Sequence, residues 1–183
     1  MKAYLSCFLL LLFLIIFSVW GYNKFFKLIY PIKYELIVNN AATKYSVEPE
    51  LIYAIIRSES GFCNNAVSRA GARGLMQITG DTFQWLQMYT HDEKMDNNYL
   101  DNPEINILYG TLFISMLKSK YFSEEIALCA YNAGMNTAEK WLRDENFTSN
   151  GEELSFIPYK ETRDYVKRVK DGKRIYKNLY FKK

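Results

Sequence analysis

The sequence has few of the residues that build metal centres. Its 183 residues include one histidine and three cysteines. Transition-metal sites rely mainly on histidine and cysteine ligands at short, regular spacings. His91 stands alone in the polar run 90–98, where we expect a solvated loop. We therefore expect no metal and no cofactor.

The cysteines are also too few for a fold that depends on disulfides. Cys7 lies in an apolar run near the N-terminus. Cys63 and Cys129 could pair in an oxidising compartment, but two cysteines do not make a disulfide framework. The interpretation that we favour is that both fill small, buried hydrophobic positions.

A strong excess of charge of one sign is absent as well. The net charge of +3 is too small to indicate a nucleic-acid partner, although it would not repel an anionic polymer or a membrane surface. Aromatic residues make up 16% of the chain. We expect most of these rings to fill a small helical core, while a few could line a sugar-binding cleft.

One long hydrophobic run is present, over residues 3–20. It carries no charge and ends beside Trp20 and Tyr22, which suit a membrane interface. As a helix it would be roughly 27 Å long, just enough to cross the hydrocarbon layer. No small-residue cleavage site follows, so we predict a signal anchor over residues 1–22, with a cleaved signal peptide and secretion as the alternative.

The lysines around this run argue against the expected orientation. Lys24, Lys27 and Lys33 follow it and only Lys2 precedes it, which favours the reverse topology. We place the rest of the chain outside the cytoplasm only because of the chemistry inferred below.

Beyond a basic and aromatic connector (23–33), the pattern is helical throughout. Apolar residues recur at spacings of three and four, and no alternating strands, repeats or low-complexity tracts occur. We predict a single all-α, or nearly all-α, domain over residues 34–183. The expected helices cover residues 33–45, 49–60, 81–89, 104–121, 124–133, 136–144 and a last one that starts at Pro158.

An acidic residue interrupts the apolar face of the second of these helices. Leu51, Ile52, Ile55 and Ile56 form the face, and Glu59 continues it by helical spacing. Loss of water and the negative end of the helix dipole would both raise the pKa of Glu59, with loss of water the larger effect. A carboxyl group that is neutral near pH 7 can act as a general acid. The alternative is that the helix has ended and Glu59 turns to solvent.

Two polar motifs accompany this carboxyl group. The stretch "AVSRAGARGLMQIT" (66–79) has glycines that allow a ligand close to the backbone, and its Ser68 and Gln77 can bind hydroxyl and acetamido groups. It is not a phosphate loop, because no Gly-Lys-Ser/Thr is present. The stretch "AYNAG" (130–134) places Tyr131 and Asn132 at the end of an apolar helix.

The order of "ESGF", "AVSRAGARGLMQIT", "NPEINILYGTLFI", "AYNAG" and "IPYKETRDYVKRV" resembles the soluble-type lytic transglycosylases of glycoside hydrolase family 23. The resemblance covers about residues 35–170 and implies a goose-type-lysozyme-like helical domain. It implies no cofactor.

The resemblance also implies roles for individual residues. Glu59 matches the single catalytic acid, and Ser68 and Gln77 match residues that contact the sugar. Tyr131 and Asn132 match the motif that faces the acid, and Glu161 matches a carboxylate in the cleft. Thr79 and Gly80 depart from the Met and Pro that are common at these positions. We expect altered packing under the sugar and a looser start of the next helix.

The activity expected from this resemblance is cleavage of the β-1,4 bond between N-acetylmuramic acid and N-acetylglucosamine in peptidoglycan, with 1,6-anhydro ends. One alternative is a hydrolytic muramidase on the same fold. Another is a non-catalytic protein that binds or assembles the cell wall within machinery that the sequence does not identify. The basic tail (170–183) could contact acidic wall polymers or lipid headgroups, or simply form a solvated helix face.

Overall fold

The computed structural model describes residues 17, 21, 24–90 and 94–182. Within these ranges all regular structure is helical, apart from isolated antiparallel bridges that join Arg73 to Val67 and to Ile78. The prediction of an all-α, or nearly all-α, domain is confirmed. The apolar run 3–20 lies outside the described residues except for Phe17, and no helix of the described ranges is long and apolar enough to cross a membrane.

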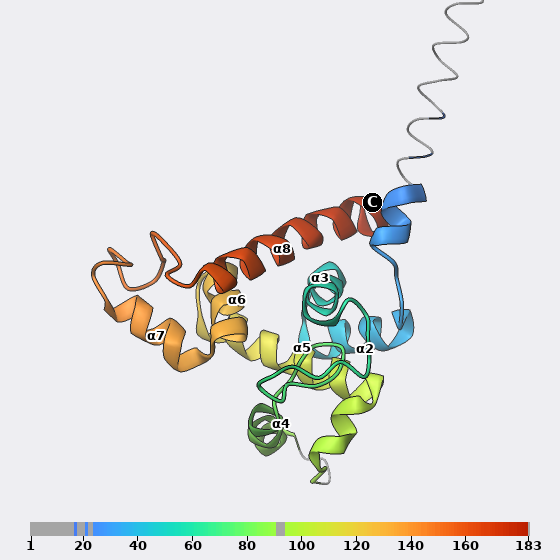
Figure 1. The fold of residues 1–183 in the computed structure, drawn as a ribbon, viewed down its shortest axis with the longest axis horizontal. Coiled ribbons are helices and arrows are strands. Elements are labelled where there is room, and N and C mark those ends of the chain that lie inside the picture. The colour runs from blue at the N-terminus through green and yellow to red at the C-terminus, as the bar shows by residue number, and fades with distance from the viewer. Residues whose placement is uncertain (1–16, 18–20, 22–23, 91–93, 183) are drawn as a thin grey trace, which may run out of the picture.

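The α-helices are α2 (Glu35–Tyr45), α3 (Pro49–Ser60), α4 (Gly80–Leu86), α5 (Pro103–Lys120), α6 (Glu124–Ala133), α7 (Met135–Arg143) and α8 (Lys160–Tyr176). In Figure 1 the chain runs from α2 on the right to α6 and α7 on the left, and α8 then returns along the top to the right. Short 3₁₀ turns, η1 (Gln87–Tyr89) and η2 (Asn97–Asp101), precede α5, and a π-helical segment, η3 (Lys177–Phe181), follows α8.

The last long helix starts later than predicted. Pro158 was expected at its first turn, but α8 begins at Lys160 after Tyr159, whose backbone is extended. The reason is that Arg163 donates from Nη1 to the carbonyl oxygens of Ile157 and Pro158 at 2.6 and 3.1 Å. These bonds tie the preceding loop to the first turn of the helix instead of extending the helix backwards.

The core is built around α3 and α8. The predicted inward face of α3 is confirmed, because Leu51, Ile52, Ile55 and Ile56 have no exposed surface. The two helices come close together where Gly172 faces Ala54, since a Cβ on Gly172 would lie 3.3 Å from the Cβ of Ala54. This close crossing brings the middle of α8 against the end of α3 that carries Glu59.

Helix α5 is buried on more sides than its sequence pattern suggests. Helical spacing places Ile105, Leu108, Leu112 and Met116 on one apolar face, but three of these are only partly buried and the fully buried positions lie elsewhere on the helix. They include Ile107, Tyr109, Ile114 and the polar Asn106 and Thr111. Contacts with α2, α6, α4 and η2 surround α5, so a one-sided pattern does not describe it.

The two cysteines among the described residues, Cys63 and Cys129, do not pair. Cys63 is exposed and Cys129 is buried, and both are free thiols. The expectation of a small buried position therefore holds for Cys129, where burial raises the pKa of the thiol to about 12, and is wrong for Cys63.

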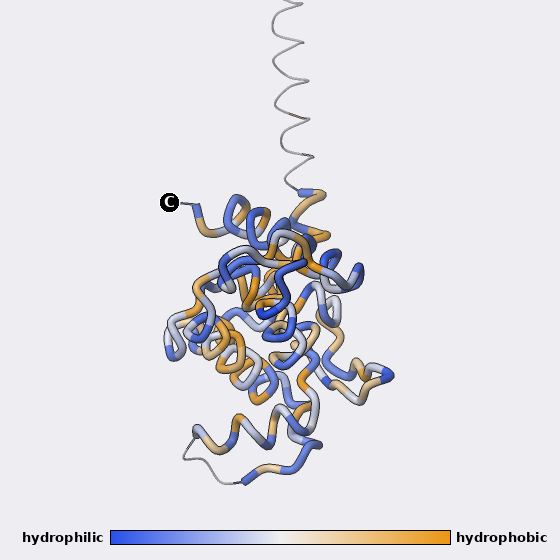
Figure 2. The backbone as a smooth tube through the Cα atoms, turned by 90° about the vertical axis from the view of Figure 1, so that its left-hand side faces the viewer, coloured by the Kyte–Doolittle hydropathy of each residue, from blue (hydrophilic) through white to orange (hydrophobic). Residues whose placement is uncertain are grey.

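The connector predicted for residues 23–33 packs onto the far end of the chain. Residues 24–29 are helical. The Tyr30 ring meets Tyr176 edge-on at 5.4 Å, and the Tyr180 hydroxyl donates to the Tyr30 carbonyl oxygen at 2.8 Å. Figures 1 and 2 show from two directions that residues 24–29 and the C-terminal end lie at the same end of the molecule.

Candidate functional site

Glu59 lies in the last turn of α3, where the chain leaves the helix. Gly61 ends the helix with a left-handed backbone (φ +58°), a conformation that favours glycine. The Ser60 hydroxyl donates to the Leu75 carbonyl oxygen at 2.8 Å, which fixes the helix end against the loop 66–78. Glu59 itself is only partly exposed. It is thus held in a defined place and can still reach a ligand.

The surroundings of Glu59 keep its carboxyl group protonated to an unusually high pH. Burial is the main cause and raises the pKa of Glu59 to about 7, from an ordinary value of 4.5. The negative charge of Glu161 on α8 also raises this pKa, whereas Tyr165 and Arg168 lower it. The direction and the leading cause agree with the sequence-based prediction.

Two residues near Glu59 were not predicted from the sequence. Tyr165 has a fully buried hydroxyl that makes no hydrogen bond of good geometry, yet lies close enough to Glu59 to lower its pKa. Arg168 contributes a positive charge. A usable signal existed, since Glu161, Tyr165 and Arg168 follow one another at helical spacings of four and three and so share one face of α8.

The loop 66–78 carries two of the predicted binding residues. Gln77 has a left-handed backbone (φ +50°), and its Nε2 donates to the carbonyl oxygens of Ala66 and Gly74 at 3.0 and 2.9 Å. The exposed Ser68 accepts a bond from the Ala72 amide on its Oγ at 3.1 Å. Both side chains therefore help to hold the loop. The Gln77 Oε1 and the Ser68 hydroxyl proton are the groups that a ligand could use.

A buried amide from α5 fixes the middle of this loop. Asn106 accepts a bond from the Met76 amide at 2.7 Å and donates to the carbonyl oxygens of Arg73 and Leu100, each at 2.9 Å. Gly74 (φ +78°) passes so close that a Cβ there would overlap the Asn106 amide. Asn106 lies within the "NPEINI" motif, but nothing in its spacing indicated this role.

Met76 packs against α5 one turn further along. A Cβ on Gly110 would lie 2.5 Å from the Met76 sulfur, so a glycine is required for this contact. Asn106 and Gly110 are four residues apart on the same face of α5. One helix therefore sets both the backbone and the side-chain position of the loop.

Helix α6 brings Tyr131 against the same loop. The Tyr131 hydroxyl donates to the Met76 carbonyl oxygen at 2.8 Å. Burial, together with the nearby charge of Glu59, raises the pKa of Tyr131. The neighbouring Asn132 is partly exposed in the last turn of α6. Among the predicted site residues, the structure thus brings Glu59, Tyr131 and Glu161 together. Ser68 lies near the start of the loop 66–78, and no contact among the described residues joins it to Glu59.

Other polar residues near the loop have structural roles. Asp101 pairs with Arg73, which donates from Nε at 3.0 Å. Thr79 caps α4 by accepting from the Thr82 amide at 3.3 Å. Thr79 therefore gives α4 a defined start even though Gly80, not Pro, begins it.

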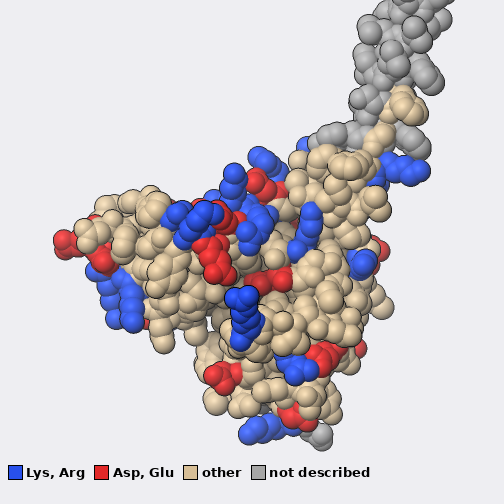
Figure 3. Space-filling model, in the orientation of Figure 1, with Lys and Arg blue, Asp and Glu red and all other residues tan. Residues whose placement is uncertain are grey.

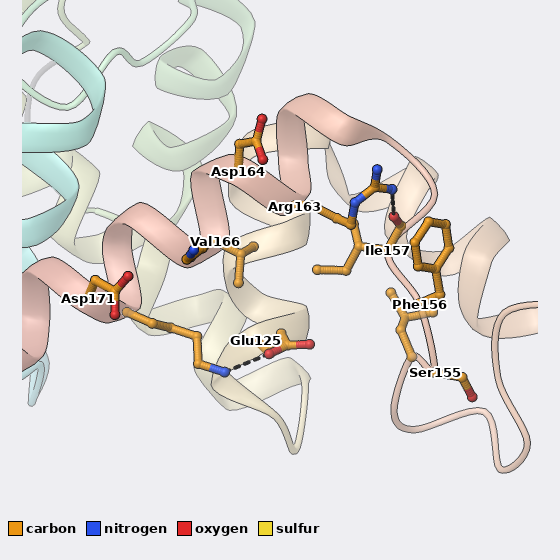
Figure 4. Close-up of a pocket in the computed structure, with 11 residues that line it drawn as sticks. Glu125, Ser155, Phe156, Ile157, Arg163, Asp164, Val166 and Asp171 are labelled. Atoms are coloured by element: carbon orange, nitrogen blue, oxygen red, sulfur yellow. Dashed lines mark hydrogen bonds and ion pairs between the residues drawn. The ribbon is translucent and has the colours of Figure 1, made fainter.

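The surface of the molecule is hollowed on one face. Figure 3 shows a hollow between the lobe that carries α7 and the lobe that carries α4. A separate cavity of about 550 Å³ lies along α8, lined by Glu125, Phe156, Arg163 and Lys170 among others (Figure 4). It does not include Glu59, and Lys170 and Arg163 are already bonded to Glu125 and Ile157 across it. We therefore assign the site to the partly exposed end of α3 and not to this cavity.

Comparison with known proteins identifies related chains. Residues 37–153 match the family model described as the transglycosylase SLT domain. The chain is 34% identical over 157 residues to a protein of Haemophilus influenzae named as a soluble lytic murein transglycosylase, covering 85% of this chain and 26% of that protein. It is 29% identical over 170 residues to the membrane-bound lytic murein transglycosylase C of Pectobacterium atrosepticum, covering 79% and 47%.

A solved structure has the same fold. An inactive mutant of the lytic transglycosylase Slt from Pseudomonas aeruginosa superposes with a TM-score of 0.72 and 30% identity, covering 81% of this chain and 24% of that one. The chain thus spans about half, or less, of the length of these relatives. The matched family model and the shared fold establish that this chain belongs to the transglycosylase SLT domain family.

Proposed function

We propose that this chain is a peptidoglycan lytic transglycosylase in which Glu59 is the catalytic acid. The observation that carries the proposal is a carboxyl group that is held, partly exposed, at the end of α3, where burial raises its pKa to about 7. A carboxyl group with this pKa is substantially protonated near neutral pH and can both give and take a proton. Family membership supports the choice of substrate.

The reaction needs one carboxyl group used twice. Glu59 donates its proton to the oxygen of the bond between N-acetylmuramic acid and N-acetylglucosamine. The carbon–oxygen bond breaks with help from the substrate's own N-acetyl oxygen, and the N-acetylglucosamine leaves with a free hydroxyl group. The Glu59 carboxylate then takes the proton of the C6 hydroxyl, whose oxygen attacks the anomeric carbon, displaces the N-acetyl oxygen from it and closes the 1,6-anhydro ring. Glu59 is protonated again, and no water is consumed.

This route suits a site with a single buried acid. Most glycosidases use two carboxylates, and substrate-assisted enzymes are a recognised exception. Glu161 is close enough to influence Glu59 but is exposed on α8. Attack by a hydroxyl of the same sugar is favoured by proximity, which can be equivalent to about 10⁵–10⁸ M of reactant.

The remaining predicted residues are proposed to hold the glycan. Ser68, Gln77 and Asn132 offer neutral hydrogen-bonding groups suited to hydroxyl and acetamido groups. The Tyr131 hydroxyl already donates its proton to the Met76 carbonyl oxygen, so Tyr131 would contact a sugar through its oxygen lone pairs or its ring. Glu161 would lie beside the peptide-bearing sugars.

The test is mass spectrometry of peptidoglycan digested with the purified chain. We expect 1,6-anhydromuramic ends, and no products with Glu59→Gln. Glu152→Gln, an exposed loop carboxyl, is the matched control and should retain full activity. Reducing muramic ends would identify a hydrolytic muramidase. Binding to sacculi without any products would identify a non-catalytic wall-binding protein.

The substrate also bears on the location of the protein. Because peptidoglycan lies outside the cytoplasm, we propose that the domain does too, attached through residues 3–20 or secreted after cleavage of a signal. A phosphatase that folds only outside the cytoplasm, fused at the C-terminus, should be active in cells. An inactive fusion at normal abundance would refute this placement.

A further inference from the structure

The short helical segment 24–29 exposes large apolar side chains beside lysines. Phe25 and Leu28 are 57% and 79% exposed. They are three residues apart and therefore lie on one face of the helical turn. Lys24 and Lys27 flank them and are also exposed. Apolar side chains rimmed by lysines are the pattern of segments that lie in a membrane interface.

The C-terminal segment extends this surface from the other end of the sequence. The Lys27 ammonium group lies 5.4 Å above the Tyr180 ring, and the Tyr180 hydroxyl bonds to Tyr30. Lys177 and Lys182 in and after η3 are exposed and make no ion pair with the described residues. Both views of the molecule place these segments together (Figures 1 and 2).

The lysines of the middle of α8 differ in this respect. Lys170 pairs with Glu125 at 2.6 Å, and Lys173 pairs with Glu124 at 2.7 Å and with Glu48 at 3.2 Å. Their charge is already balanced within the protein. Lys177 and Lys182 have no such ion pair with the described residues, so their positive charge remains available at the end of the molecule where Phe25 and Leu28 are exposed.

We propose that Lys24, Phe25, Lys27, Leu28, Lys177 and Lys182 form an interfacial surface that docks the domain onto a leaflet of anionic phospholipid. Phe25 and Leu28 enter the boundary between headgroups and acyl chains, and the lysines contact lipid phosphates. Docking would fix the orientation of the domain, with α4 pointing away from the membrane (Figure 1). The proposal does not depend on glycan cleavage, and it adds a second contact to the predicted anchor.

The experiment uses the full chain reconstituted in vesicles, with a tryptophan reporter at the C-terminal part of the surface. Asn178 is exposed in η3 and far in sequence from the apolar run. Asn178→Trp is compared with Phe122→Trp, at a position 93% exposed between α5 and α6. Lipids brominated near the headgroup quench a tryptophan that touches them. The parent chain provides the background.

We expect quenching at position 178 in vesicles that contain phosphatidylglycerol, and little in vesicles of phosphatidylcholine alone. Position 122 should be quenched in neither. The double variant K177Q/K182Q should lower the ratio of docked to undocked domain by about 30-fold. K94Q/K140Q removes two exposed lysines elsewhere and should leave quenching unchanged.

Other results would overturn the proposal. Equal quenching in neutral and anionic vesicles would mean that the anchor alone brings the domain close. No quenching at position 178, together with pelleting on purified wall polymer that K177Q/K182Q abolishes, would assign the surface to the wall. Neither result would affect the digestion test of Glu59.

Discussion

The Tyr131 hydroxyl donates to the Met76 carbonyl oxygen at 2.8 Å, and this bond joins α6 to the loop that carries Gln77. Burial and the nearby Glu59 raise the pKa of Tyr131 well above its ordinary value, so it remains a neutral donor at any pH near 7. The proton of Tyr131 is thus fixed in place, while that of Glu59 can be exchanged near neutral pH. This contrast supports the proposal that Glu59 carries out acid–base chemistry and that Tyr131 has a positioning role.

The pH dependence of activity should respond in opposite directions to two neighbours of Glu59. Tyr165 lowers the pKa of Glu59 and Glu161 raises it. Because the acid must be protonated, activity should fall as pH rises through about 7. Tyr165→Phe should move this fall to higher pH, and Glu161→Gln should move it to lower pH. The measurement is kcat/KM against pH on soluble glycan fragments.

Tyr159→Phe is the control for the first substitution, since Tyr159 is exposed at the start of α8. Its profile should match that of the unmodified chain. Shifts of the same sign for Tyr165→Phe and Glu161→Gln would contradict the assignment of Glu59 as the titrating acid.

The raised pKa of Glu59 also makes stability depend on pH. The folded state holds its proton up to about pH 7, while the unfolded state releases it near 4.5. The resulting stabilisation is complete below pH 4.5 and is lost as pH rises to about 7. At 1.36 kcal/mol per pKa unit, and allowing for partial exposure, the loss is roughly 2–3 kcal/mol.

Urea unfolding of the chain and of Glu59→Gln at pH 4.5 and pH 8 measures this effect. Glutamine cannot ionise, so the variant should gain stability relative to the unmodified chain between the two pH values. Parallel changes in the two proteins would show that Glu59 has an ordinary pKa in the folded state.

Among the polar residues outside the candidate site, Asn106 should be the one whose substitution lowers stability most. Asn106→Asp keeps an acceptor for the Met76 amide but turns the donor toward Arg73 and Leu100 into a second acceptor. Two buried carbonyl groups then lose their partner and face a carboxylate. We expect a loss of about 2–4 kcal/mol in the free energy of unfolding and a loss of cleavage.

The matched control is Asn98→Asp, which makes the same chemical change at an exposed position. It should alter stability by less than about 0.5 kcal/mol. If both variants unfold at the same urea concentration as the unmodified chain, Asn106 does not hold the loop.

Much of the helical framework could be predicted because it depends on local signals. Pro49 and Gly61 bound α3, and Asn102 and Ser123 cap α5 and α6, as their sequence positions indicate. The raised pKa of Glu59 was also predictable, because helical spacing continues the apolar face of α3 to this residue.

The supports of the site could not be predicted in this way. Asn106 acts on a loop about 30 residues away in sequence, and its partners are backbone groups that carry no sequence signal. In the sequence, nothing distinguishes Tyr165 from the aromatic residues of the core. Only the crossing of α3 and α8 brings its hydroxyl close to Glu59. The exposure of Cys63 depends on the loop that follows α3, which has no periodic pattern.

The support of the loop 66–78 by Asn106 and Gly110 has a consequence for the order of folding. The Met76 amide, the Arg73 carbonyl oxygen and the Met76 side chain find their partners on α5, so the bonds within the loop do not complete its structure before that helix is in place. During refolding, the proposed cleavage activity should therefore return no earlier than α5 becomes buried. During unfolding, this activity should be lost before α5 becomes exposed.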